Sequence, residues 1–283
     1  MSEADLLARL RYLAMVARRR GGRSSLFGFD AARAENETQV IGLRDYAPGD
    51  DYRHVDWRWC ARRDELLTRL FATNEDNHAY ILLDVSASMG QGEPPKFALA
   101  RRIAAMLGYA ALRHWTCLGI SAFASGIVDD APPMRHQAQM GRLLRFLEDQ
   151  TLRAEATDLR RTAEQFGRRY QRRGPVVVIS DLYDAGGFQP GLDILQADGY
   201  RPRVVRLYDA GEQTPDLRGD VELFDVEMQT SQRVTVTERA MQRYRELHAE
   251  FEASVDAYCA RRGIPYLTIA ADAPETEVLL AVA

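Results

Sequence analysis

Two uninterrupted apolar runs constrain the fold of this chain more than any other feature of its sequence. The runs AYILLDVS (residues 79–86) and PVVVISDL (residues 175–182) lack the polar–apolar alternation of a half-exposed strand. Such runs are typical of β-strands that are covered on both faces, as in parallel sheets. Segments with helical spacing of apolar residues alternate with these runs along the chain. The sequence therefore predicts a doubly wound α/β fold, with a mostly parallel sheet and helices on both faces.

The other elements of this fold are expected from the same patterns. Apolar spacing predicts five helices, one from Pro95 through Ala111 and the others over residues 140–147, 157–173, 189–198 and 241–258. Further strands are expected over residues 116–125, 203–209 and 264–270, with an antiparallel hairpin made by residues 221–226 and 233–237. Thr235 and Glu238 have the spacing of a capping box at the start of the last helix.

We expect the chain to be organised in three parts. Residues 1–40 would form an N-terminal amphipathic helix (3–20) and a linker. Residues 41–75, which are rich in charged and aromatic side chains, would pack on the core. Residues 76–283 would form the α/β domain, with a C-terminal hairpin and helix.

The composition argues against several classes of protein. The 283 residues carry a formal net charge of −4, with an isoelectric point near 5.8, which argues against nucleic acid as the main partner. No apolar run reaches the roughly 20 residues of a membrane span, and the acidic start is unlike a signal peptide. Three widely separated cysteines favour free thiols in a reducing compartment. We therefore expect a cytoplasmic protein that does not span a membrane. Of the 37 basic residues only Lys96 is a lysine, a bias that a GC-rich genome would produce.

Oxygen-bearing side chains follow both buried strands and precede one of the predicted helices. In a doubly wound sheet, ligands bind at the carboxyl ends of the strands, where the strand order reverses. The residues expected to meet there are Asp84, Ser86, Ser88, Thr157 and Asp181. Such a set suits Mg²⁺ (or Mn²⁺), which prefers oxygen ligands. With few direct carboxylates, the ion would stay electrophilic and could accept an Asp or Glu of a partner protein.

The D-x-S-x-S turn, with a later threonine and a later aspartate, resembles the metal-ion-dependent adhesion site (MIDAS) of von Willebrand factor A domains. The resemblance implies that Ser86, Ser88 and Thr157 bind the ion directly. It implies that Asp84 and Asp181 act largely through coordinated water. The segment RAEATDL departs from the pattern, because it lacks the glycine that often precedes the threonine.

The upstream segment RDYAPGDDYRHVDWRWCAR resembles the signature of the DUF58 family. The matching positions are Arg44, Tyr46, Pro48, Gly49, Asp50, Arg53, Trp57, Ala61 and Arg62. The resemblance implies a bacterial protein that works with a MoxR-type AAA+ ATPase, as an adaptor or co-chaperone for a client protein. Many relatives carry a membrane hairpin before the signature, and no such hairpin is expected here. From the residues alone, we interpret the segment as an ion-pair cluster that covers a sheet edge, with a binding patch as the alternative.

Rival chemistries lack their motifs. Gly90 and Gly92 do not belong to a phosphate loop, because Pro95 stands at the third glycine position. No G-x-S-x-G motif of a serine hydrolase, D-x-D of a haloacid dehalogenase-type phosphatase or paired-cysteine zinc motif occurs at these strands, and the five histidines lie outside recognisable motifs. The preferred hypothesis is a non-enzymatic, Mg²⁺-dependent protein-binding module. The alternatives are a metal-dependent phosphoesterase that uses the same site, a scaffold with a degenerate site, and residues that merely cap the next helix.

Overall fold

The computed structural model describes residues 40–47, 55–57, 59–60, 66–71, 78–114, 117–213, 215, 219–225, 230–274, 277–278 and 281. These residues fall into two compact units, one within residues 29–75 and the other within residues 76–283. The helix that the sequence predicts over residues 3–20 lies outside the described residues.

The larger unit is built on a six-stranded sheet with the order β10-β7-β6-β3-β4-β5. All neighbouring strands are parallel except β4 and β5, which are antiparallel. The chain passes from β3 to β4 on one side and later returns to β6 on the other side, so the strand order reverses beside β3. The strands are β3 (His78–Asp84), β4 (Cys117–Phe123), β5 (Ile127–Met134), β6 (Pro175–Ser180), β7 (Arg201–Tyr208) and β10 (Tyr266–Ala270).

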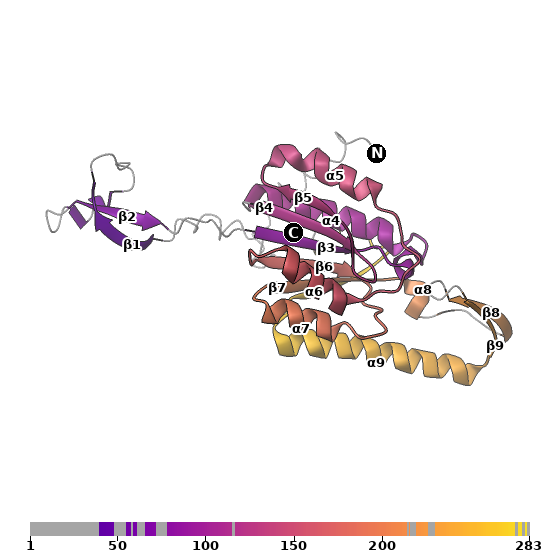
Figure 1. Cartoon of the computed structure of the whole chain (residues 1–283). Helices are drawn as coiled ribbons and strands as arrows, with labels where there is room; N and C mark the ends of the chain where they lie inside the picture. The colour runs from indigo at the N-terminus through magenta and orange to yellow at the C-terminus, as the bar shows by residue number, and fades with distance from the viewer. Residues whose placement is uncertain are drawn as a thin grey trace. The chain divides into compact units, whose positions relative to one another are not determined.

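Helices cover both faces of this sheet (Figure 1). On one face lie α4 (Lys96–His114) and α5 (Met140–Asp149). The other face is covered by α6 (Leu159–Arg169), α7 (Gln189–Ala197) and α9 (Glu238–Arg262), whose apolar side chains share one core with the strands. The predicted doubly wound α/β fold is thereby confirmed, because nearly all residues of β3, β4 and β6 are buried.

An aromatic cluster anchors the second face. Phe166 of α6 lies with its ring centroid 5.2 Å from that of Tyr80, 4.8 Å from that of Tyr170 and 5.0 Å from that of Tyr200. Burial of rings of this size, in edge-on and tilted arrangements, makes a large contribution to the stability of a core. The cluster fixes α6 against β3, the strand that ends at Asp84.

The close approach of β3 and β6 depends on a glycine. A Cβ atom built on Gly174, the residue before β6, would lie 1.9 Å from the carbonyl oxygen of His78, the first residue of β3. Any other residue would therefore push the two strands apart at this end. Since β3 and β6 carry Asp84 and Asp181 at their other ends, the pairing of these strands positions the candidate site.

The sequence also suggests that loops over residues 89–95, 124–138 and 183–191 give the proposed binding its specificity, and the expectation of a loop is wrong for the middle part of residues 124–138. Residues 127–134 form β5, an antiparallel edge strand. Its sequence IVDDAPPM contains two acids and two prolines, which are depleted in strands but tolerated at a sheet edge. The edge position, which only the strand order decides, explains why the pattern is misleading.

The predicted C-terminal hairpin and long helix are present, but the cap of the helix lies elsewhere. β8 (Gly219–Asp225) pairs with β9 (Thr230–Val236), so Thr235 belongs to a strand and its hydroxyl donates to Asp220 at 2.6 Å. The hydroxyl of Thr237 instead accepts the backbone N–H of Ala240 at 3.2 Å. The Thr235–Glu238 capping box is therefore wrong. Similarly, α6 covers residues 159–169 rather than 157–173, because Asp158 is its N-cap.

The smaller unit contains a two-stranded antiparallel sheet. β1 (Val40–Asp45) pairs with β2 (Leu67–Phe71), and Val55 makes an isolated bridge to Thr68. Trp57 is exposed within this unit. The ion-pair cluster expected in this segment involves Arg44, Asp50, Arg53, Asp56 and Arg62. Of these residues, Asp50, Arg53 and Arg62 lie outside the described part of the chain, so that interpretation stays a prediction.

Within the described part of the chain, no helix combines the length and the apolar character that a membrane crossing requires.

Candidate metal centre

The candidate site lies where β3 and β6 end side by side. These two strands pair in parallel, with Leu83 opposite Ile179. Asp84 is the last residue of β3, and Asp181 directly follows β6. This is also the place where the strand order reverses, which is the usual ligand site of open α/β sheets.

Asp84 is the centre of the hydrogen-bond network. Its side chain is fully buried, and its Oδ1 accepts the backbone N–H of Ser86 at 2.9 Å. Its Oδ2 accepts the hydroxyl of Ser180 at 2.5 Å and that of Thr157 at 3.4 Å. The carboxylate thus ties together both strands and the loop before α6.

Ser86 and Ser88 lie next to each other in the turn after β3. Their hydroxyl oxygens are 3.1 Å apart, and both side chains are buried. Ser86 is the N-cap of the short 3₁₀ helix η2 (Ala87–Gly90), but its side chain makes no capping hydrogen bond there. The alternative that Ser86 merely caps the next helix does not fit this arrangement.

Thr157 enters the site from the loop that precedes α6. The following residue, Asp158, caps α6 by accepting the backbone N–H of Arg161 at 2.8 Å. Thr157 is therefore not needed as a cap, and its hydroxyl faces Asp84. The loop reaches the site although Ala156 stands where the pattern often has glycine.

Asp181 completes the set of five. It is fully buried, and its Oδ1 accepts the backbone N–H of Tyr183 at 3.1 Å. Burial and, next, the negative charge of Asp181 raise the pKa of Asp84 to about 7, against the opposing effect of the hydrogen bonds from Ser180 and Ser86. The structure therefore brings all five sequence-predicted residues into one buried cluster.

Lys96 and Glu212 belong to this cluster but were missed as site residues. Lys96 begins α4 and is fully buried, with its Nζ 2.8 Å from Asp181 Oδ2 and 2.5 Å from Glu212 Oε1. Burial by itself lowers the pKa of this ammonium, but the two carboxylates outweigh it and raise the pKa. One sequence signal points to Lys96, since it is the only lysine of the chain and follows the D-x-S-x-S turn. No local pattern marks Glu212.

The donor atoms suit a hard divalent cation. Among the residues that the structure describes, no group of three or more histidine, cysteine, aspartate or glutamate side chains is arranged to hold a metal. The five predicted residues instead offer two carboxylates and three hydroxyls, an all-oxygen set of the kind that Mg²⁺ and Mn²⁺ bind. The residues present therefore fit the ion that the sequence predicts.

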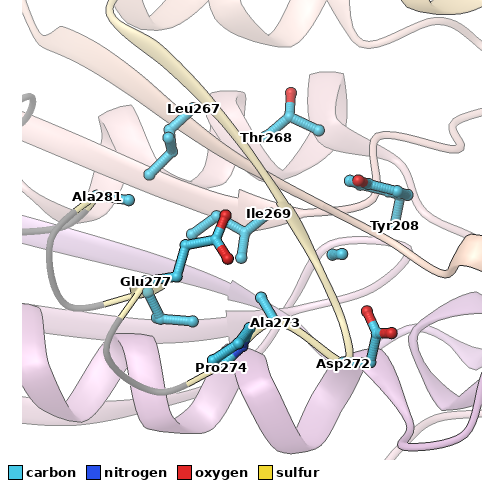
Figure 2. A pocket seen from close by; sticks show the side chains of 11 residues that line it. Tyr208, Leu267, Thr268, Ile269, Asp272, Ala273, Pro274, Glu277 and Ala281 are labelled. Carbon is cyan, nitrogen blue, oxygen red and sulfur yellow. The ribbon is translucent and has the colours of Figure 1, made fainter.

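A separate cavity of about 300 Å³ lies beside β10 and the C-terminal segment (Figure 2). It is lined by residues that include Tyr208, Ile269 and Pro274. None of the five candidate ligands lines it, so it is not part of the site described above.

The doubly wound α/β fold, with the D-x-S-x-S turn at its switch point, is the arrangement that the resemblance to von Willebrand factor A domains predicts. The chain belongs to the family described as "Protein of unknown function DUF58", whose profile matches residues 42–254. Similar proteins include the uncharacterised proteins Rv1480 of Mycobacterium tuberculosis and Mb1516 of Mycobacterium bovis. Each is 25% identical over 241 residues, which cover 80% of this chain and 73% of the relative.

Two solved structures are also similar. The conserved hypothetical protein BatB from Bacteroides thetaiotaomicron has a TM-score of 0.44 at 17% identity, covering 71% of this chain and 93% of BatB. An aerotolerance-related membrane protein from Bacteroides fragilis has a TM-score of 0.38 at 18% identity, covering 60% and 86% of the two chains. Similarities at this level do not bear on the function of the chain.

Proposed function

We propose that this protein is a non-enzymatic, Mg²⁺-dependent protein-binding module. One observation carries the proposal. Oxygen-bearing side chains from the turn after β3, from the loop before α6 and from the end of β6 gather around Asp84, the last residue of β3. These side chains come from distant parts of the sequence and still share one buried cluster. Residues that served only to form turns would have no reason to meet in this way.

Each residue would have a defined task. The hydroxyls of Ser86, Ser88 and Thr157 would hold the ion, while Asp84 orients Thr157 and the Ser86 backbone through its own hydrogen bonds. Asp181 would act through coordinated water, since both of its oxygens already accept hydrogen bonds within the protein. When bound, Mg²⁺ would supply an open coordination position for an Asp or Glu of a partner protein.

A metal-dependent phosphoesterase is the alternative function, and one observation favours it. A carboxyl group with a pKa near 7 is suited to general acid–base catalysis, and Asp84 has such a pKa. However, Asp84 is fully buried and both of its oxygens accept hydrogen bonds, so it is not presented to a substrate. Protein binding is therefore the better-supported function.

A scaffold with a degenerate site is favoured by a different observation. The ammonium of Lys96 already compensates the charge of Asp181, so this carboxylate has a cationic partner without a metal ion. Two buried carboxylates share this cluster, however, and Asp84 has no ion pair with Lys96 among the interactions of the described residues. The cluster keeps a negative charge that a divalent cation would neutralise.

We propose a MoxR-type AAA+ ATPase as the partner, with the protein acting as an adaptor or co-chaperone for a client. Membership of the DUF58 family supports this part of the proposal, and the geometry of the site does not bear on it. The client is expected to offer a carboxylate to the site.

Calorimetric titration with Mg²⁺ and Mn²⁺, alone and with an acidic peptide, tests the proposal. We expect binding by the native protein and its loss in Ser88→Ala, whereas Ser254→Ala, an exposed serine of α9, serves as the matched control. Absence of binding under all conditions would leave the scaffold as the better hypothesis. Turnover of a generic phosphoester that disappears in Ser86→Ala would establish the phosphoesterase instead.

A further inference from the structure

Lys96 occupies a position that is unfavourable for a lysine unless it is compensated. It is the first residue of α4, where the helix dipole disfavours a positive charge, and its side chain is fully buried. Removing an ammonium from water carries a large cost. The compensation comes from two carboxylates, those of Asp181 and Glu212, and from the ring of Tyr183, whose centroid lies 5.2 Å from Nζ.

On one side, Lys96 holds a candidate ligand in place. Asp181 has one hydrogen-bond donor for each oxygen, the backbone N–H of Tyr183 for Oδ1 and the ammonium of Lys96 for Oδ2. The backbone donor is part of the turn after β6, whereas the ammonium comes from a different element. Lys96 therefore decides how the Asp181 carboxylate is oriented within the turn.

On the other side, Lys96 holds the short helix α8 (Ala210–Gln213). Glu212 Oε1 accepts a hydrogen bond from the ammonium of Lys96. Its Oε2 lies 3.4 Å from the Tyr183 hydroxyl oxygen and 3.4 Å from the Asp209 backbone nitrogen. The carbonyl oxygen of Glu212 accepts the hydroxyl of Tyr244 on α9 at 2.6 Å. The next residue, Gln213, donates to Glu252 of α9 at 3.3 Å. Lys96 thus connects Asp181 with α8, and Tyr244 and Gln213 connect α8 with α9.

We propose that Lys96 is a positioning residue of the candidate metal centre, and that its bond to Glu212 couples occupation of the centre to α8 and α9. This inference rests on the proposed function. A divalent cation held beside Asp181 repels the ammonium and competes with it for the same carboxylate. The ammonium then depends more strongly on Glu212. Because such coupling is reciprocal, a change at Glu212 must change the affinity of the centre for the cation.

The single lysine makes this coupling measurable. Protein labelled with ¹³C-lysine gives one ε-methylene signal from the side chain of Lys96, which is titrated with Mg²⁺ while calorimetry supplies the Kd. We expect the signal to shift with the same Kd. In Glu212→Gln the ammonium of Lys96 would keep Asp181 as its only charged partner and would compete more strongly with Mg²⁺ for that carboxylate. We therefore expect Mg²⁺ to bind at least about fivefold more weakly. Glu222→Gln is the matched control, because it removes the same charge from an exposed position in β8.

Hydrogen exchange provides a second measurement that does not depend on the lysine signal. We expect Mg²⁺ to change the exchange of amides in residues 209–213 of the native protein, and to change it less in Glu212→Gln. Mg²⁺ could bind without shifting the lysine signal and with the same Kd in Glu212→Gln and Glu222→Gln. That result would contradict the coupling but would still support the proposed metal centre. If the native protein binds neither Mg²⁺ nor Mn²⁺, the proposed function fails and this inference fails with it.

Discussion

The hydroxyl of Thr157 lies 3.4 Å from Oδ2 of Asp84, although 73 positions separate the two residues in the sequence. The contact joins the loop before α6 to the end of β3, next to the place where β6 ends. It turns a local turn motif into a site with donors from three regions of the chain.

Asp84→Asn is expected to weaken Mg²⁺ binding by about 10–100-fold, the usual effect of losing a residue that orients metal ligands. The amide keeps the size of the side chain, but its nitrogen cannot accept the hydrogen bonds that Asp84 accepts from the Ser180 and Thr157 hydroxyls. Calorimetric titration measures the change, and Asp220→Asn, at an exposed position in β8, is the control. Equal Mg²⁺ affinities of the two variants would show that Asp84 does not contribute to metal binding. Asn is preferred to Ala here, because Ala would leave several buried donors unpaired.

The metal-free protein is expected to lose stability as the pH rises toward neutrality. The pKa of Asp84 is about 7 in the folded protein, above its ordinary value of 3.8, so the folded state binds more protons than the unfolded state between these values. The stabilisation from protonated Asp84 is fully present below pH about 4 and is lost as the pH rises through about 7. Urea unfolding between pH 5 and 8 would measure this, and Asp84→Asn should flatten the profile. Added Mg²⁺ should weaken the dependence, and a profile that Asp84→Asn leaves unchanged would contradict the assignment.

Lys96→Met is expected to destabilise the fold by about 3–5 kcal/mol, the usual cost of breaking a buried ion pair by removing one partner. Methionine fills the space of the side chain but leaves Asp181 and Glu212 facing each other without a cation. Urea unfolding gives the free energy. Arg243→Met is the matched control, since Arg243 pairs with Glu246 on the exposed face of α9 and such pairs contribute less than about 1 kcal/mol. Similar values for the two variants would show that the buried pairs contribute little.

Gly174→Ala is expected to destabilise the protein by about 3 kcal/mol, the upper range for overpacking. The added Cβ would meet the carbonyl oxygen of His78, a backbone atom that cannot turn away. In Gly186→Ala, the control, the nearest atom is Oδ1 of the Asp184 side chain at 3.3 Å, which can adjust more easily. Thermal or urea unfolding compares the two. A Gly174→Ala protein as stable as Gly186→Ala would show that the spacing of β3 and β6 is less constrained than the structure indicates.

Much of the fold could be predicted from local patterns. The runs that end in Asp84 and Asp181 are apolar without alternation, and both are buried strands of a parallel sheet. The central strands could be found because they are continuous apolar runs. β5 was missed because an edge strand with two prolines and two acids lacks such a run. Thr235 has the right spacing for a cap, but the pairing of β8 with β9 extends past it and leaves the capping position to Thr237.

By itself, the sequence determined the buried central strands, the approximate places of most helices and the chemical type of the candidate ligands, because periodicity and the residues that end an element act within a few positions of one another. Only the tertiary structure decided that Thr157 meets Asp84, and that Lys96 meets Asp181 and Glu212, which are 85 and 116 positions away from it. These contacts depend on the strand order and on which helix covers which face. That order is set by the packing of the whole core, so no local stretch of the chain encodes it.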